Sequence, residues 1–306
     1  MLPWQDVLHE GPVPDVSRAE LLRVRARFLS DCGWGRQSTI RASLERRDRQ
    51  LRAALRDGRR LVLWFEHDLY DQLQLLDALA LAHGLGGSLE SIVVDAFPGK
   101  PGFRGLGELT ADELETLWPA RREVTAATLA EAVEAWAAFR APEPSALAEI
   151  AVQGFDELPF LAPALRRLLE DLPDVKNGLS RTERQTLEAI GAGARTPLEV
   201  FLATQNMEEA PFFGDAWFYR ALSALGQGDE RLLETADGEP LPAAPPLSDG
   251  QDYGWLGLRV TEAGERVLAG EADRVELLGV DRWLGGSHVT SESGWRWDPA
   301  GGTCTL

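Results

Sequence analysis

The stretch Leu61-Val-Leu-Trp-Phe-Glu-His-Asp-Leu-Tyr-Asp-Gln72 decides the fold of the first half of the chain. Five apolar residues lead directly into Glu66, His67 and Asp68, and a helical pattern begins at once. A short, continuous apolar run is typical of a strand that is buried on both faces of a parallel sheet. Ionisable side chains at the carboxyl end of such a strand lie where open α/β sheets bind ligands. The stretch therefore predicts both a strand and a candidate site.

The residues that follow predict a strand–helix–strand unit. Apolar residues spaced three and four apart predict a helix over residues 68–82. A second apolar run, Ser91-Ile-Val-Val-Asp95, predicts the next strand. Two strands joined by a helical crossover pair in parallel. We therefore expect an α/β fold with a Rossmann-like parallel-sheet domain over residues 1–140.

The remainder of the chain is predominantly helical in pattern. Residues 141–178 predict a helical connector, which ends in a segment rich in loop-forming residues. From residue 179 onward, three capped helices precede a β segment over 256–260. Helices and a β segment in this order resemble a winged helix. We expect residues 179–306 to form a mainly helical, winged-helix-like domain.

The charge of the second domain bears on its partners. The whole chain has a net charge of -18, and residues 179–306 hold ten arginines and 21 acidic residues. DNA-reading helices carry basic and amide side chains, yet the third helix of this domain offers only Arg220. The composition argues against DNA as a partner and leaves a protein partner of the acidic domain open.

An arginine-rich stretch stands against this acidic background. Residues 18–60 contain 13 arginines and five acidic residues. Such a stretch can bind an anionic ligand or nucleic acid. It can equally pair with acidic residues of the same protein, or form a solvated helix face. The sequence leaves these alternatives open.

Composition also bears on the cellular location. No apolar run approaches the roughly 20 residues that a membrane-spanning helix requires. The residues after Met1 lack a basic segment followed by an apolar core, which is the pattern of a secretory signal. Cys32 and Cys304 form neither a disulfide framework nor a metal-binding spacing. We expect a cytoplasmic protein without a membrane partner.

Five segments carry a resemblance to known families. They are Trp4–Pro14, Trp64–Gln74, Leu179–Arg184, Phe213–Asp215 and Gly279–Gly286. The first two resemble an uncharacterised bacterial family, domain of unknown function 1835, and the other three resemble its companion, domain of unknown function 3658. The resemblance implies almost nothing about activity. Members open with a further strand that ends in Gly-Asp-Ser, so it also implies a first loop of the site ahead of Met1.

The residues at the strand end are the first catalytic candidates. We expect His67 to act as an acid or base that Glu66 or Asp68 orients. Asp68, Asp71 and Gln72 fall on one face of the first helical turn, where Asp71 would join the catalytic group and the other two would contact substrate. Helix capping alone explains Asp68 well and Asp71 in part. It does not require Glu66 or His67.

His9 is a further catalytic candidate, and with Glu10 it lies in a polar, proline-containing segment that is typical of a functional loop. A histidine that is hydrogen-bonded within a structural turn is the alternative. If His9 and His67 converge, they form an acid–base pair, or a metal site with Asp68 or Glu66. No HxxxH or HxH spacing supports a metal.

Basic residues outside the strand end are candidates for substrate binding. Lys100 and Arg104 lie in the glycine-rich segment Phe97–Gly107, which can hold an anion or simply connect a strand to a helix. The segment matches neither the P-loop nor the dinucleotide fingerprint, so no cofactor can be named. Arg282, like Arg296, has tryptophan neighbours and either clamps a ligand or seals an interdomain contact.

Together these features give two functional hypotheses. The first is an enzyme that acts on a small anionic or phosphorylated substrate by histidine and carboxylate acid–base chemistry. The second is a non-catalytic regulatory or protein-interaction module with a degenerate winged helix. The sequence lacks the nucleophile-elbow, catalytic-cysteine and zinc patterns of the commonest hydrolases.

Overall fold

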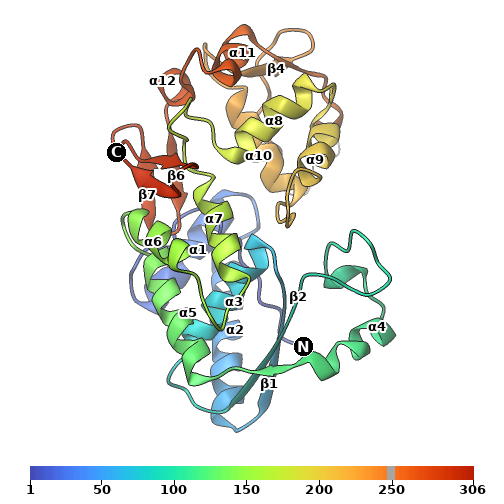
Figure 1. Cartoon of the computed structure of the whole chain (residues 1–306), viewed down its shortest axis with the longest axis vertical. Helices are drawn as coiled ribbons and strands as arrows, with labels where there is room; N and C mark the ends of the chain where they lie inside the picture. Colours follow the sequence, from blue (N-terminus) through green and yellow to red (C-terminus); the bar gives the residue numbers. More distant parts are fainter. Residues whose placement is uncertain (247–251) are drawn as a thin grey trace.

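The protein is described by a computed structural model that covers residues 1–246 and 252–306. About 46% of the chain is helical and about 12% is in strands. Figure 1 shows helices around a small sheet in the lower part, and a second group of helices in the upper part. The predicted α/β class is confirmed at this level, because the sheet contains a parallel pair.

The first part of the chain alternates helices with short strands. In order, its elements are α1 (Arg18–Asp31), α2 (Gln37–Arg56), β1 (Arg60–Glu66), α3 (Leu69–Ala82), β2 (Ser88–Val94), η1 (Leu106–Glu108), α4 (Ala111–Thr116), η2 (Trp118–Ala120), β3 (Arg122–Glu123), α5 (Ala126–Phe139), α6 (Ser145–Gln153) and α7 (Leu161–Leu169).

The second part begins with three helices and ends in two hairpins. Its elements are α8 (Arg181–Gly191), α9 (Pro197–Gln205), α10 (Asp215–Leu225), β4 (Leu233–Thr235), η3 (Tyr253–Trp255), β5 (Leu258–Val260), α11 (Glu262–Ala269), α12 (Arg274–Leu278), β6 (Asp281–Leu284), β7 (Ser287–Thr290), β8 (Arg296–Asp298) and β9 (Thr303–Thr305).

The sheet of the first part has the order β1-β2-β3. Strands β1 and β2 pair in parallel from Arg60 opposite Ser88 to Glu66 opposite Val94, as the helical crossover predicts. β3 adds a short antiparallel edge. Within the described residues β1 has only one neighbouring strand, so most of its side chains are half-buried and only Phe65 is buried. The expectation that β1 is buried on both faces was therefore wrong.

Helix α3 forms the centre of the first part. It contacts β1, α2, α5 and α7, and residues around nearly its whole circumference are buried. Asp68 caps its first turn by accepting a hydrogen bond from the backbone N–H of Asp71. Its interior is not purely apolar, because Gln72, Gln74 and Asp77 are also buried. These polar groups anchor neighbouring segments to the helix.

Arg25 holds the N-terminal segment in place. This segment has neither helix nor strand before α1, so its backbone carbonyls need donors from elsewhere. Arg25 is fully buried and forms an ion pair of 2.7 Å with Asp6. Its guanidinium also donates to the carbonyl oxygens of Val7, Glu10 and Pro12. One side chain thus fixes the backbone on both sides of His9.

A second polar cluster ties this segment to α3. Asp77 accepts hydrogen bonds from Arg18 and from the indole of Trp4, the latter at 3.0 Å. Arg47 lies 3.4 Å from the same carboxylate and stacks on the Trp4 ring. Asp48 completes the cluster by pairing with Arg18 at 2.6 Å. For these arginines of the 18–60 stretch, the alternative of pairing with the protein's own acids is the one observed.

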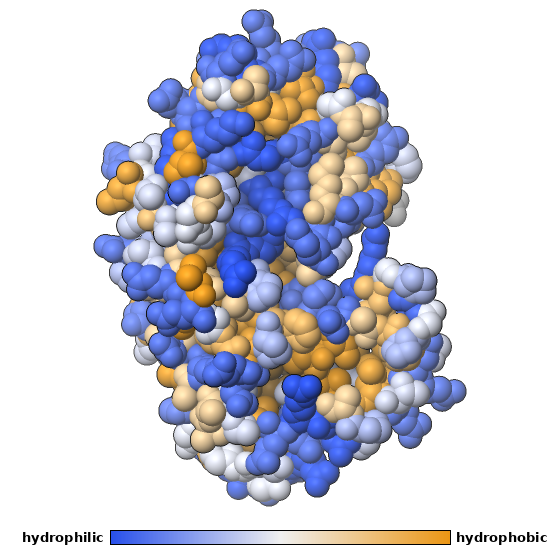
Figure 2. All heavy atoms as spheres, in the orientation of Figure 1, coloured by the Kyte–Doolittle hydropathy of each residue, from blue (hydrophilic) through white to orange (hydrophobic). Residues whose placement is uncertain are grey.

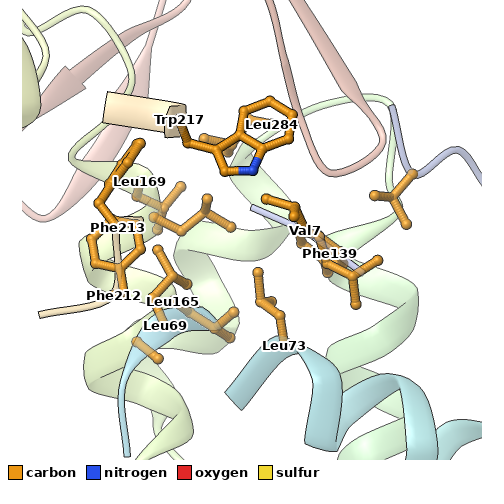
Figure 3. Close-up of a cluster of buried hydrophobic side chains, with 14 of the residues drawn as sticks. Val7, Leu69, Leu73, Phe139, Leu165, Leu169, Phe212, Phe213, Trp217 and Leu284 are labelled. Carbon is orange, nitrogen blue, oxygen red and sulfur yellow. The ribbon is translucent and has the colours of Figure 1, made fainter. Parts of the chain in front are cut away.

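The hydrophobic core is continuous between the two parts of the chain. Figure 3 shows Val7, Leu73 and Phe139 of the first part gathered with Phe213 and Trp217 of the second. The core therefore does not divide at residue 178, although the predicted division into three segments stays a prediction.

The end of the chain returns to the first part. The backbone N–H of Gly286 donates to the carbonyl of Phe139 at 2.9 Å, and that of Val13 donates to the carbonyl of Gly285 at 2.7 Å. A Cβ atom at either glycine would collide with the backbone of Phe139 or Arg140. The Gly-Gly pair is therefore required for this close approach of two backbones.

Hydrophilic residues cover most of the molecular face that Figure 2 shows. Apolar side chains gather on this face where the surface is hollowed between its upper and lower parts. Within residues 1–246 and 252–306, none of the helices combines the length and the apolar character needed to cross a bilayer.

Replacing Arg25 with Gln should lower the free energy of unfolding by about 3–5 kcal/mol, because the change leaves the buried Asp6 carboxylate without its cation. Arg27 on the same helix is a matched control, since it is highly exposed and lies 3.7 Å from Asp31. We expect Arg27→Gln to change stability by less than about 0.5 kcal/mol. Urea unfolding measures both; equal effects would show that Arg25 is not a structural clamp.

Candidate functional site

Three carboxylates meet at the junction of β1 and α3. Glu66 ends the strand, Asp68 caps the helix and Asp71 lies in its first turn. One oxygen from each side chain lies within 4.8 Å of the others. The structure thus brings together three of the residues that the sequence predicts for a site at this strand end. We call them the carboxylate cluster.

Backbone hydrogen bonds fix the geometry of the carboxylate cluster. Asp71 accepts the backbone N–H of Glu66 at 2.6 Å, and Asp68 accepts that of Asp71 at 3.1 Å. The buried amide of Gln72 donates to the carbonyl of Glu66 at 2.6 Å. Gln72 therefore braces the end of the strand, and no contact with a substrate is needed to explain its position.

The carboxylate cluster has no ion-pair partner among the described residues. Burial and, to a lesser degree, the neighbouring Asp68 carboxylate raise the pKa of Asp71 to about 7. Burial also raises the pKa of Asp68 to about 6, and that of Glu66 moves in the same direction. Near neutral pH the cluster therefore retains a proton that can be exchanged. Such a group suits acid–base chemistry, and three carboxylates at this separation could also hold a divalent cation.

The glycine-rich loop closes over Glu66. The Glu66 carboxylate accepts the backbone N–H of Leu106 at 2.7 Å. A Cβ atom at Gly105 would collide with that carboxylate, so a side chain here would displace the Glu66 carboxylate from its contact with the loop. The loop therefore positions one member of the carboxylate cluster, a role that the sequence did not indicate.

The two cations of this loop have partners away from the carboxylate cluster. The Lys100 ammonium lies 3.1 Å from the Glu113 carboxylate and also donates to the carbonyl of Glu108. The Arg104 guanidinium donates to the side chain of Asn206 at 3.0 Å, which connects the loop to the second part of the chain. The predicted anion-binding role of Lys100 and Arg104 would require both to leave these partners.

His67 is half-buried, and its ring meets that of Phe160 edge-on, with a centroid separation of 5.9 Å. Among the described residues it forms no hydrogen bond with Glu66 or Asp68, so the predicted orienting contact is not formed in this structure. Asp95, at the end of β2, is exposed. His67 is adjacent to the carboxylate cluster without being engaged by it.

His9 lies in an aromatic environment. It is only 3% exposed and packs edge-on against the rings of Tyr70, Phe212 and Phe213. Within the described residues neither ring nitrogen has a hydrogen-bond partner. Burial lowers the pKa of His9 to about 3, so the imidazole is neutral at physiological pH. The structure records no contact between His9 and His67 within the described residues, and His9 cannot supply a proton near pH 7.

Arg282 lies at a different place, in a pocket between the two parts of the chain. Its guanidinium donates to the backbone carbonyl of Asp171 at 2.6 Å and lies 3.9 Å from the Glu10 carboxylate. Arg296, by contrast, pairs with Asp273 at 2.9 Å. The sequence did not indicate that Glu10 and Arg282 face the same pocket, because only tertiary contacts bring residue 10 near residue 282.

Comparison of the chain with family models, curated proteins and solved structures gives no match. The resemblance to the two domains of unknown function is therefore still a prediction.

Replacing Asp71 with Asn should stabilise the protein at alkaline pH. Folding raises the pKa of Asp71 from about 4 to about 7, so its contribution to the unfolding free energy falls as the pH rises between these values. Asn has no such proton equilibrium and can still accept the Glu66 N–H. We expect Asp71→Asn to be more stable than the wild type by roughly 1–2 kcal/mol at pH 8, and to lose this advantage at pH 4.

Urea unfolding at both pH values provides the measurement. Asp95→Asn is the matched control, because Asp95 is exposed at the end of the neighbouring strand. We expect the control to follow the wild type at both pH values. A difference between Asp71→Asn and wild type that does not depend on pH would contradict the raised pKa.

Replacing Gly105 with Ala should disturb the contact between the loop and Glu66, because the added methyl group collides with the carboxylate. We expect a loss of about 1–3 kcal/mol in unfolding free energy. Gly107→Ala is the control, since a Cβ atom there meets no atom within 4 Å. Hydrogen exchange of the Leu106 amide should accelerate only in Gly105→Ala; equal exchange in both variants would exclude the proposed packing.

Proposed function

We propose that the protein is an enzyme that performs general acid–base catalysis on a small molecule at the carboxyl end of β1. The observation that carries this proposal is the carboxylate cluster, in which the pKa of Asp71 is raised to about 7 without a described cationic partner. An acid or base is most effective when its pKa lies near the working pH.

Each member of the carboxylate cluster has a distinct role in this proposal. Asp71 exchanges a proton with the substrate through the oxygen that does not accept the Glu66 N–H. Asp68, with a pKa of about 6, keeps the proton on Asp71 by electrostatic repulsion between neighbouring carboxylates. Glu66 adds to this repulsion and is held by the glycine-rich loop. His67 is the adjacent second proton carrier.

A small anionic or phosphorylated substrate remains part of the proposal. Lys100 and Arg104 belong to the loop whose Leu106 N–H donates to the Glu66 carboxylate. When an anion binds, Lys100 would leave Glu113 and Arg104 would leave Asn206 to contact the substrate. The exchange is chemically reasonable for Lys100, whose pair with Glu113 is partly exposed and therefore weak.

The finer features of the fold also belong to the proposal. A Rossmann-like arrangement of the first domain is supported by the order of β1, α3 and the parallel strand β2. A winged-helix-like second domain is supported by β4 pairing with β5 after three helices. It is also supported by the hydrogen bond of 2.8 Å from the N–H of Leu258 to the carbonyl of Arg195, between α8 and α9. A cytoplasmic location fits two cysteines that are both free thiols.

The alternative is a regulatory or protein-interaction module. Two large apolar side chains on neighbouring elements favour it, because Leu202 on α9 is 50% exposed and Trp255 in η3 is 68% exposed. Exposed apolar groups that lie together are characteristic of surfaces that bind other proteins. An interaction module needs no proton transfer. A reaction that depends on the carboxylate cluster would therefore distinguish the enzyme from the interaction module.

Incubation of the purified protein with a mixture of small cellular metabolites tests the proposal. Mass spectrometry should show at least one compound that the wild type consumes and that Asp71→Asn consumes at least 100-fold more slowly. Asp95→Asn is the control and should retain the wild-type rate. If turnover requires added Mg²⁺ or is lost when a chelator is added, the carboxylate cluster binds a metal ion. Equal turnover by wild type and Asp71→Asn, or no turnover by either, would reject acid–base catalysis there.

A further inference from the structure

A cavity with a volume of about 300 Å³ lies between the two parts of the chain, apart from the carboxylate cluster. Its walls come from Glu10, the segment after α7, the start of α8, one face of α10, Arg274 of α12 and the start of β6. None of the three residues of the carboxylate cluster lines it. The volume is at the small end of the range for ligand pockets and fits a molecule with a single ring or a branched chain.

Most acidic side chains of this cavity already have partners. Asp171 lies 3.2 Å from Arg167 and accepts the hydroxyl of Thr182 at 2.8 Å. Asp281 lies 2.7 Å from His288. Glu183, which also lines the cavity, lies 2.8 Å from Arg274. Because these acidic groups already have protein partners, they do not need a ligand to balance their charge.

Two charged groups of opposite sign have no close ionic partner within the described residues: Arg220, which is exposed, and Glu10, which is half-buried. Arg220 has no ion pair or hydrogen bond within the described residues and extends its guanidinium 5.6 Å from the centre of the Trp217 ring. Glu10 accepts no side-chain hydrogen bond there, and its nearest cation is Arg282 at 3.9 Å. Burial raises the pKa of Glu10, as expected of a carboxylate without a close donor. The cavity thus offers an anionic position at Glu10 and cationic positions at Arg220 and at Arg282, whose guanidinium donates to the Asp171 carbonyl.

One wall of the cavity is apolar. Phe213 and Trp217 line it and are at most 9% exposed, and Ala221 and Ala224 continue the same face of α10. Figure 3 shows that Phe213 and Trp217 belong to the same buried cluster as Leu169 and Leu284, so this wall is rigidly supported. An apolar group of a ligand can therefore be buried here.

We propose that this cavity binds a small amphipathic zwitterion, namely an α-amino acid with an apolar side chain. The carboxylate would pair with Arg220 and the ammonium with Glu10, while the side chain packs on Trp217 and Phe213. A simple anion fits less well, because it would place a second negative charge beside Glu10. A simple cation would use Glu10 but gain nothing from the Arg220 guanidinium.

Calorimetric titration of the full-length protein with L-phenylalanine and L-leucine tests this inference. At least one should bind saturably in the millimolar range or better. The analogues 3-phenylpropionate, which lacks the ammonium, and 2-phenylethylamine, which lacks the carboxylate, should bind at least tenfold more weakly than L-phenylalanine. Failure of both amino acids to bind, or equal binding of 3-phenylpropionate, would overturn the proposal.

Matched variants locate the binding in the cavity. Arg220→Gln should weaken amino-acid binding at least tenfold. Because Arg220 is exposed, this change should not impair folding. Glu10→Gln should weaken amino-acid binding but not that of 3-phenylpropionate. Arg259→Gln is the control. Arg259 is exposed and pairs with Glu234, and neither residue lines the cavity. Wild-type affinity in Arg220→Gln would exclude this cavity as the site.

Asp71→Asn separates this inference from the proposed catalytic function. The variant should bind the amino acid with wild-type affinity, because the carboxylate cluster does not line the cavity. Loss of binding in Asp71→Asn would show that the cavity does not act as an independent site.

Discussion

The ion pair between Arg25 and Asp6 is the interaction on which the rest of the structure depends. It is buried, and the same guanidinium satisfies three backbone carbonyls of a segment that has no helix or strand. A charge in the interior is tolerated only when it is paired and hydrogen-bonded. Because of this pair, an irregular segment acquires a fixed course. His9 then lies among aromatic rings and Glu10 faces the cavity between the two parts of the chain.

Helix α3 connects the irregular segment to the carboxylate cluster. Its buried Gln74 accepts the backbone N–H of Asp6 at 3.1 Å, and Asp77 holds Trp4. Two members of the carboxylate cluster, Asp68 and Asp71, occupy the N-terminal end of the same helix. The buried polar side chains along α3 therefore position other segments of the chain, although buried polar groups without partners would destabilise the core. One rigid element thus supports both the N-terminal segment and the candidate catalytic site.

The carboxylate cluster and the cavity between the two parts of the chain differ in how their charges are arranged. At Glu66, Asp68 and Asp71, like charges are kept together by backbone N–H donors, and the repulsion is relieved by retaining a proton. In the cavity, Arg220 and Glu10 have opposite signs but no close contact with each other in the described structure. The first arrangement favours proton exchange, and the second favours a ligand that carries both charges.

The sequence by itself determined the local features, because these depend on residues close together in the chain. It predicted the parallel pairing of the two strands from the helical crossover, and the grouping of Glu66, Asp68 and Asp71 from the junction of strand and helix. It did not predict that β1 would be only half-buried, because burial depends on how many strands the sheet acquires. Only the tertiary structure decided which residues face each other over long distances in sequence. It gave Lys100 and Arg104 partners outside the carboxylate cluster and brought Arg282 near Glu10, since such contacts depend on the packing of whole elements.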